Sequence, residues 1–207
     1  MDNALELRGV SRNFGGLRAV DNVSMTVARG TTHVIIGPNG AGKTTLFALI
    51  SGELEASSGK VWLFGHDVTS WSATRRARQG MSRTYQITNV FADLTVEQNV
   101  LLAIRGRQTG RLSVFKQDRP PADMAEQIEQ LLVRCGLEGR RFVRAGDLSY
   151  GEQRLLELAI AIGNEPEILL LDEPAAGLSP AERGPMADTI RQLSKSLTVV
   201  LIEHDME

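Results

Sequence analysis

The segment that most constrains the fold is the glycine-rich stretch GPNGAGKT at residues 37–44, which fits the pattern G-x-x-x-x-G-K-[ST]. It follows a short apolar run, HVII at 33–36, and leads into a stretch of helical character, Lys43–Ser51. A strand, a glycine turn and a helix in this order aim backbone N–H groups and a helix N-terminus at one point, where they attract phosphate oxygens. The sequence therefore predicts a nucleotide-binding α/β fold.

Two more apolar runs have the length of buried strands, ILLL at 168–171 and TVVLI at 198–202. Helical stretches at 152–162 and 181–194 come just before them. Short apolar strands separated by helices are typical of a parallel sheet that is covered on both faces. These runs predict the parallel-sheet core of an α/β fold.

The N-terminal part has a different pattern. Residues 4–10 and 18–27 alternate between apolar and polar side chains, as half-buried strands do, and Gly15-Gly16 forms a turn between them. The sequence therefore predicts an antiparallel β part before the parallel core.

The chain has 207 residues, which is enough for one domain or for one domain with a small subdomain. Between about 87 and 147 the recognisable elements are helical, at Val96–Ile104 and Ala122–Cys135. We therefore expect a single domain whose catalytic core consists of residues 1–86 and 148–207, with a helical insert subdomain between them.

The charges of the chain nearly balance, since 23 Lys and Arg against 25 Asp and Glu give a formal net charge of −2. General nucleic-acid binding usually needs a strongly basic surface, so we expect no nucleic-acid partner. The stretch Arg105–Arg119 has five basic residues and one acidic residue. It is either a solvated loop or a segment that is attracted to anionic lipid headgroups or to an acidic partner.

Cys135 is the only cysteine, which excludes an internal disulfide and fits a reducing compartment. Its setting, LLVRCGL, favours a small core residue over a reactive thiol. No apolar run is long enough for a membrane helix, and the N-terminus MDNALELRGV lacks the features of a signal peptide. We expect a soluble, cytoplasmic protein.

Several positions of the glycine-rich turn have a physical role in holding ATP. Gly40 and Gly42 let the backbone close around phosphate oxygens without a side-chain clash. Lys43 adds a compact positive charge, and the Thr44 hydroxyl is a natural ligand for Mg²⁺, so we expect ATP and Mg²⁺ as cofactors. The ATP-binding residues expected in this turn are Gly37, Pro38, Asn39, Gly40, Ala41, Gly42, Lys43, Thr44 and Thr45.

An acidic pair, Asp172 and Glu173, follows the apolar run at 168–171. Carboxylates at the end of a buried strand are costly unless a cation or a reacting group needs them there. We expect Asp172 to orient Mg²⁺ and Glu173 to polarise the attacking water. Alone, the pair would also fit the solvated end of a strand.

Residues 148–153, LSYGEQ, resemble the signature of the ATP-binding subunits of ABC transporters, which is normally LSGGQ. Ser149 and Gly151 match, Tyr150 replaces a glycine and Glu152 replaces the usual glutamine. The Ser149 hydroxyl and the N–H groups near Gly151 predict a second anion site at a helix N-terminus, although a simple helix cap would look the same. In the family this turn caps the γ-phosphate held by a second ATP-binding subunit.

The resemblance implies a P-loop NTPase (RecA-like) α/β fold, and it implies roles for residues that alone would mean little. Gln86 is similar to the glutamine that senses Mg²⁺ and the attacking water, and His204 to the switch histidine that contacts the γ-phosphate. With Glu173 and Lys43 they form the expected catalytic set, and Thr44, Gln86 and Asp172 form the expected metal set. Phe14 is similar to the aromatic residue that stacks on adenine.

The stretch AAGLS at 175–179 resembles the loop through which subunits of the family contact each other, but Ser179 stands where an aspartate is common. The family usually continues past the switch histidine, whereas this sequence ends three residues later at Glu207. We therefore expect the C-terminal end of the usual domain to be missing.

The stretches FGGLRAVDNVS and LDEPAAGLSP are similar to importers of branched-chain and other hydrophobic amino acids, and a related subgroup serves urea and short amides. The resemblance implies a second ATP-binding subunit, membrane permeases and, indirectly, a periplasmic binding protein as partners. It implies a peripheral position on the inner face of the cell membrane. The alternatives are a soluble ABC ATPase that remodels nucleic acid or ribosomes, a regulatory module that does not hydrolyse ATP, and a small-molecule kinase.

Overall fold

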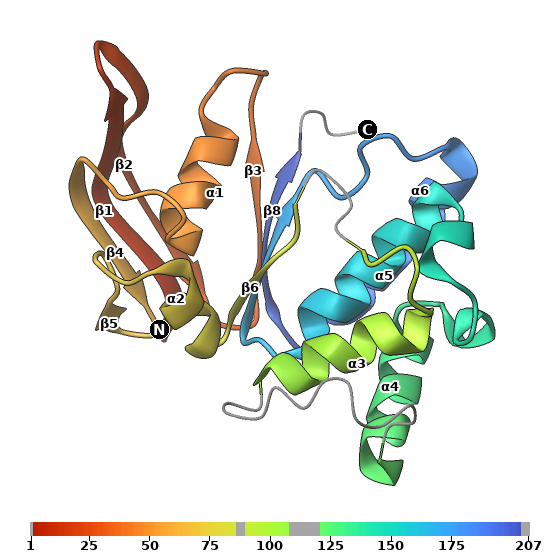
Figure 1. Cartoon of the computed structure of the whole chain (residues 1–207). Coiled ribbons are helices and arrows are strands. Elements are labelled where there is room, and N and C mark those ends of the chain that lie inside the picture. The colour runs from red at the N-terminus through yellow and green to blue at the C-terminus, as the bar shows by residue number, and fades with distance from the viewer. Residues whose placement is uncertain (1, 86–89, 108–120, 204–207) are drawn as a thin grey trace. The chain divides into compact units, whose positions relative to one another are not determined.

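The computed structural model describes residues 2–85, 90–107 and 121–203 (Figure 1). The chain divides into two compact units, which we call the sheet unit and the helical unit. The sheet unit comprises residues 1–83, 167–173 and 194–207, and the helical unit comprises residues 84–166 and 174–193. The expected division of the chain into a catalytic core and an insert at about 87–147 stays a prediction.

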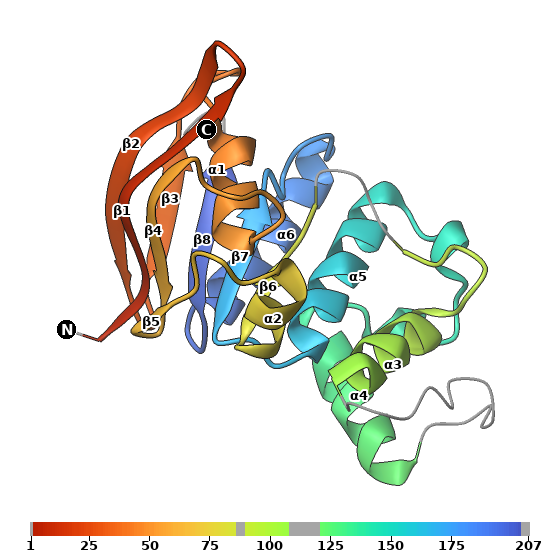
Figure 2. The same cartoon turned by 60° about the vertical axis from the view of Figure 1, so that its left-hand side comes forward.

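One sheet of the sheet unit is antiparallel, in the strand order β2-β1-β4-β5 (Figure 2). Its strands are β1 (Asn3–Phe14), β2 (Leu17–Ala28), β4 (Ser58–Leu63) and β5 (His66–Asp67). The predicted N-terminal pair is confirmed, and both of its strands extend further than the alternating pattern indicated.

The second sheet is parallel, in the order β3-β8-β7-β6. Its strands are β3 (Thr32–Ile36), β6 (Met81–Arg83), β7 (Ile168–Asp172) and β8 (Thr198–Glu203). The register pairs Ile36 with Glu203, and Asp172 with Ile202. The carboxyl ends of β3, β7 and β8 therefore lie side by side at one edge, where ligands of open α/β sheets bind.

Helix α1 (Lys43–Ser51) contacts β2 of the antiparallel sheet and β6 and β7 of the parallel sheet. Its buried side chains Phe47, Leu49 and Ile50 join a core that includes Leu5 of β1 and Val200 of β8. Because α1 is apolar on the sides that face both sheets, it holds them in one core. The bounds of α1 are those that the sequence predicted.

Helix α2 (Ala73–Arg78) places one charged side chain inside the sheet unit. Arg76 is 2% exposed and donates to the carbonyls of Leu49 and Ile50 at 2.7 Å each. These carbonyls belong to the last turn of α1, where intrahelical partners run out. Arg76 therefore caps α1, and burial lowers its pKa to about 10.

The helical unit contains four described helices and two single 3₁₀ turns. They are α3 (Val96–Arg107), α4 (Ala122–Arg134), Glu138–Arg140, Ala145–Asp147, α5 (Tyr150–Gly163) and α6 (Pro180–Leu193). All four helices were predicted from the sequence, with ends that differ by up to three residues. Cys135 is fully buried beyond α4, as expected, and burial raises the pKa of its thiol to about 12.

Among residues 2–85, 90–107 and 121–203, no helix has the length and apolar character needed to cross a membrane.

We predict that Arg76→Ala lowers the free energy of unfolding by about 3 kcal/mol, because it leaves buried carbonyls at the end of α1 without a donor. Chemical denaturation of the nucleotide-free protein measures this. The control is Arg78→Ala, which removes an exposed arginine from the same helix and should change the free energy little. Equal losses for both variants would contradict the capping role of Arg76.

Candidate functional site

The glycine-rich turn joins β3 to α1 through two left-handed residues. Gly40 has φ 80° and Gly42, the residue before the first turn of α1, has φ 82°. A Cβ atom on Gly42 would lie 2.1 Å from the carbonyl oxygen of Ala19 in β2, so only glycine fits there. Gly42 has no side chain to cap α1, and the N-terminus of this helix is therefore available to a phosphate.

Lys43 is held inside this turn, since its side chain is 8% exposed. Its Nζ donates to the carbonyl oxygens of Gly37 at 2.5 Å and of Pro38 at 3.0 Å. The two carbonyls keep the ammonium group within the loop, where it can bind a phosphate oxygen. Thr44 is exposed on the first turn of α1, and Thr45 is partly buried.

Asp172 ends β7 with its carboxylate buried, at 1% exposure. Arg83 Nη2 donates to its Oδ2 at 3.0 Å, and Arg83 Nη1 donates to Glu53 at 2.9 Å. Burial raises the pKa of the Asp172 carboxyl, while the Arg83 guanidinium lowers it in part. The carboxylates of Glu173 and Glu53 raise this pKa further.

The other oxygen of Asp172, Oδ1, is buried and has no hydrogen-bond partner. A buried carboxylate oxygen without a partner is costly, and a bound cation would offset that cost. The residues that the structure describes contain no group of three or more His, Cys, Asp or Glu side chains that could hold a metal. A single buried carboxylate such as that of Asp172 fits Mg²⁺, which is commonly held by one or two carboxylates together with water and substrate phosphates.

Glu173 follows β7 in a strained backbone conformation. Its φ is 50°, a left-handed value that is uncommon outside glycine, and its side chain is 7% exposed. Its N–H donates to the carbonyl oxygen of Ile202 in β8 at 3.1 Å, which fixes this residue beside β8. Strain of this kind concentrates at functional sites, where the surrounding structure holds it.

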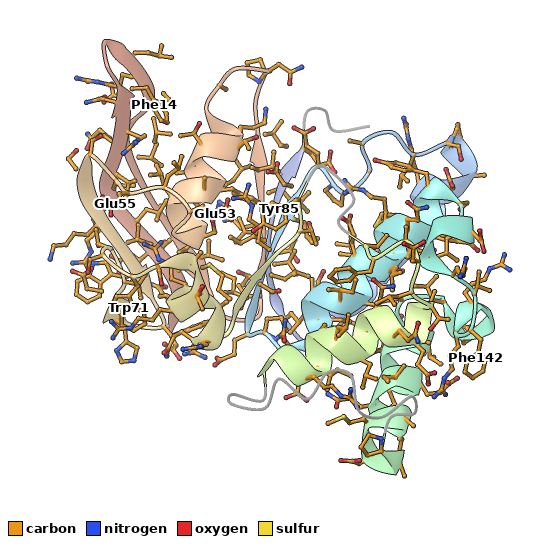
Figure 3. All side chains as sticks on the ribbon, viewed as in Figure 1. Phe14, Glu53, Glu55, Trp71, Tyr85 and Phe142 are labelled. Atoms are coloured by element: carbon orange, nitrogen blue, oxygen red, sulfur yellow. The ribbon has the colours of Figure 1, made fainter. Side chains whose placement is uncertain are left out.

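Phe14 lies at the end of β1, where the hairpin turns into β2 (Figure 3). Its ring is 44% exposed, and the guanidinium of Arg12 stacks on it at 4.7 Å from the ring centre. Arg12 is in turn held by a hydrogen bond of 2.7 Å to the carbonyl of Glu55. The exposed ring suits stacking on a base, as the sequence predicted, and this role of Phe14 stays a prediction.

The LSYGEQ turn begins α5 with a capping box. The Ser149 hydroxyl accepts from the N–H of Glu152 at 3.2 Å, and the Glu152 carboxylate accepts from the N–H of Ser149 at 2.9 Å. The same hydroxyl and the N–H of Gly151 also donate to one carboxylate oxygen of Glu182, at 3.3 and 3.0 Å. The turn therefore binds a carboxylate, and its role toward a phosphate stays a prediction.

Tyr150, which replaces a glycine of the usual signature, packs against the AAGLS loop. A Cβ atom on Gly177 would lie 3.1 Å from the ring of Tyr150. Gly177 also has a left-handed φ of 76°, so two requirements favour glycine at this position. Ser179, which stands where an aspartate is common in the family, donates its hydroxyl and its N–H to one carboxylate oxygen of Glu182, at 2.7 and 3.0 Å.

The structure brings together the glycine-rich turn, Asp172 and Glu173 at one edge of the parallel sheet. Ser149 and Gly151 belong to the helical unit. Gln86 and His204 lie outside the described residues, as does the part of the basic stretch from 108 to 120.

The sequence analysis did not identify two residues that contact the predicted site residues. Arg83 binds Asp172, which is 89 residues away, and Glu182 binds Gly151, which is 31 residues away. The only local sequence signal for either residue was the S-x-x-E spacing of Ser179 and Glu182, which is typical of a helix start.

Known proteins resemble this chain over nearly its whole length. The family described as ABC transporter matches residues 20–176. The high-affinity branched-chain amino acid transport ATP-binding protein LivG of Salmonella typhimurium is 37% identical over 210 residues, covering 98% of this chain and 82% of that protein. BraF of Pseudomonas aeruginosa, with the same description, is 38% identical over the same shares.

Solved structures have the same fold. The ATP-binding cassette MJ1267 of an ABC transporter, in its ADP conformation, superposes with a TM-score of 0.88 at 29% identity, covering 100% of this chain and 83% of that chain. The cbiO1 protein of Clostridium perfringens, part of the ABC transporter complex cbiONQ, gives a TM-score of 0.83 at 26% identity, covering 99% and 80%. The predicted P-loop NTPase fold is confirmed.

We predict that Gly40→Ala and Gly42→Ala differ in stability, although both residues are left-handed. Backbone strain alone should cost Gly40→Ala about 1 kcal/mol, because a Cβ atom there meets nothing within 4 Å. Gly42→Ala should lose about 2 kcal/mol more, because its Cβ atom overlaps the Ala19 carbonyl. Denaturation of the nucleotide-free protein measures both losses. A Gly42→Ala protein as stable as Gly40→Ala would show that the turn does not pack on β2 as described.

Proposed function

The chain belongs to the ABC transporter family as an ATP-binding subunit, and from that premise we propose that it powers an importer of branched-chain or other hydrophobic amino acids. ABC ATPases of this family hydrolyse ATP, so the chain is an ATP hydrolase. The observation that carries the substrate class is the likeness to LivG and BraF, at 37% and 38% identity over 98% of the chain. Both are described as branched-chain amino acid transport ATP-binding proteins.

We propose that the β- and γ-phosphates of ATP lie in the glycine-rich turn. The N-terminus of α1 and the Lys43 ammonium supply positive charge there, and the left-handed glycines leave room for the oxygens. Mg²⁺ would be held by the Thr44 hydroxyl, by Gln86 and by Asp172, whose unpartnered Oδ1 supports this role. When bound, the ion neutralises phosphate charge as the terminal phosphate leaves.

Glu173 is our candidate for polarising the attacking water. The hydrogen bond from its N–H to Ile202 holds Glu173 in a left-handed backbone conformation next to Asp172, so the residue is positioned before water arrives. His204 and Gln86 would contact the γ-phosphate and the water. Most of the acceleration would come from positioning and from charge stabilisation rather than covalent chemistry.

Subunits of this family dimerise and work with membrane permeases. We propose that the Ser149 hydroxyl and the N–H of Gly151 cap the γ-phosphate held by a second ATP-binding subunit, in a two-fold arrangement. Closure of the dimer would move the permeases through a surface near Phe91–Val100, where the Phe91 side chain is 61% exposed. The protein would then act on the inner face of the membrane, with a periplasmic binding protein delivering the substrate.

We predict that Glu173→Gln binds ATP with nearly unchanged affinity and hydrolyses it at least about 100-fold more slowly, because a neutral amide cannot polarise water. ATP-loaded dimers should accumulate. Calorimetry, phosphate release and light scattering measure the three properties. The matched control is Glu165→Gln, since Glu165 also has a left-handed φ, of 49°, but is exposed at the end of α5. Normal turnover by Glu173→Gln would remove Glu173 from this role.

The substrate class predicts the effect of Lys43→Ala on transport. Cells whose native copy has this substitution should lose uptake of labelled leucine, because the phosphates lose their principal side-chain cation, and should keep uptake of labelled urea. Lys60→Ala, in the exposed part of β4, serves as the control. Normal leucine uptake with lost urea uptake would favour the urea and short-amide alternative.

A further inference from the structure

Glu182, in the first turn of α6, binds two helix N-termini with one carboxylate. Its Oε2 accepts from the N–H of Ser179 at 3.0 Å and from the Ser179 hydroxyl at 2.7 Å, which completes the cap of its own helix. Its Oε1 accepts from the N–H of Gly151 at 3.0 Å and from the Ser149 hydroxyl at 3.3 Å. The carboxylate therefore joins the start of α6 to the start of α5, which Figure 1 labels.

The Oε1 contacts use donors that the capping box of α5 leaves free, since the box satisfies the N–H groups of Ser149 and Glu152 but not that of Gly151. The start of α5 already has a reciprocal capping box, formed by Ser149 with Glu152. At the start of α6, Oε2 alone accepts from both the N–H and the hydroxyl of Ser179. Oε1 is thus an additional anionic ligand of the LSYGEQ turn, bound by the groups that the proposed function assigns to the γ-phosphate of a second subunit.

The fit of this carboxylate against the turn is close. A Cβ atom on Gly151 would lie 2.7 Å from Oε1 and 2.8 Å from the carboxyl carbon of Glu182. Glycine at position 151 therefore lets the carboxylate reach the backbone. Hydrogen bonds from Ser179 and from the N–H of Gly151 lower the pKa of Glu182, so this group is negatively charged at neutral pH.

We propose that Glu182 occupies the phosphate position of the Ser149–Gly151 turn in the unpaired subunit and competes there with the γ-phosphate of the partner's nucleotide. Two anions cannot share one pair of donors, so Oε1 must withdraw before the subunits close around ATP. The contacts with Ser179 can remain while Oε1 moves away from the turn, because Ser179 binds the other carboxylate oxygen, Oε2. Glu182 thereby sets the ATP concentration at which subunits pair. This inference rests on the proposed function of the turn.

The test of pairing uses Glu173→Gln as the parent, because that variant should hold ATP without turning it over. Adding Glu182→Gln should lower the ATP concentration for half-maximal pairing by roughly tenfold, since the competing charge is removed. Light scattering against ATP concentration measures this. The control is Asp188→Asn, which neutralises an exposed acid on the same helix and should leave the midpoint unchanged. An unchanged or higher midpoint for Glu182→Gln would overturn the proposal.

A second measurement needs no pairing and uses inorganic phosphate as the probe. In the single subunit, the amide resonance of Gly151 should shift saturably with phosphate in Glu182→Gln and hardly at all in the native protein. Equal titrations in both proteins would show that Glu182 does not compete for the turn. If the Glu173→Gln parent fails to pair with ATP, the proposed function falls, while the phosphate titration still decides the competition.

Discussion

Hydrogen bonding of β8 to β3 on one side and to β7 on the other fixes where three strands end. The register sets Ile36 opposite Glu203 and Asp172 opposite Ile202, so the glycine-rich turn and the acidic pair begin at the same edge. A shift of this register would move Asp172 and Glu173 along the sheet and away from the turn. The proposed nucleotide site therefore depends on parallel strand pairing before it depends on any side chain.

The same edge contains buried charge that the fold alone does not need. Asp172 is almost completely buried, is paired through one oxygen with Arg83 and has no partner for the other oxygen. Glu173 is held beside it with a left-handed backbone. Both features cost stability, and an ATP-dependent Mg²⁺ site gives a reason for them. Arg83 offsets part of the cost, and the proposed Mg²⁺ would offset more of it.

Two helix starts in this chain are suited to bind an anion, the start of α1 in the sheet unit and the start of α5 in the helical unit. Gly42 leaves the first helix uncapped by any side chain, whereas Ser149, Glu152 and Glu182 surround the start of the second. The two turns therefore differ in what an incoming phosphate must displace. Under the proposed function, the first turn would hold the subunit's own nucleotide and the second would regulate pairing.

The sequence by itself determined the glycine-rich turn, the acidic pair and the LSYGEQ turn, and with these motifs the family. It also determined the longer helices and strands, because short-range patterns of apolar, glycine and capping residues specify them. It missed β4, β5, β6 and α2, which are too short or too exposed to have a clear period. Gln86 and His204 stay predictions. Tertiary structure alone decided that Arg83 pairs with Asp172 and that Glu182 reaches Gly151, since residues 89 and 31 positions apart meet only when strands and helices pack.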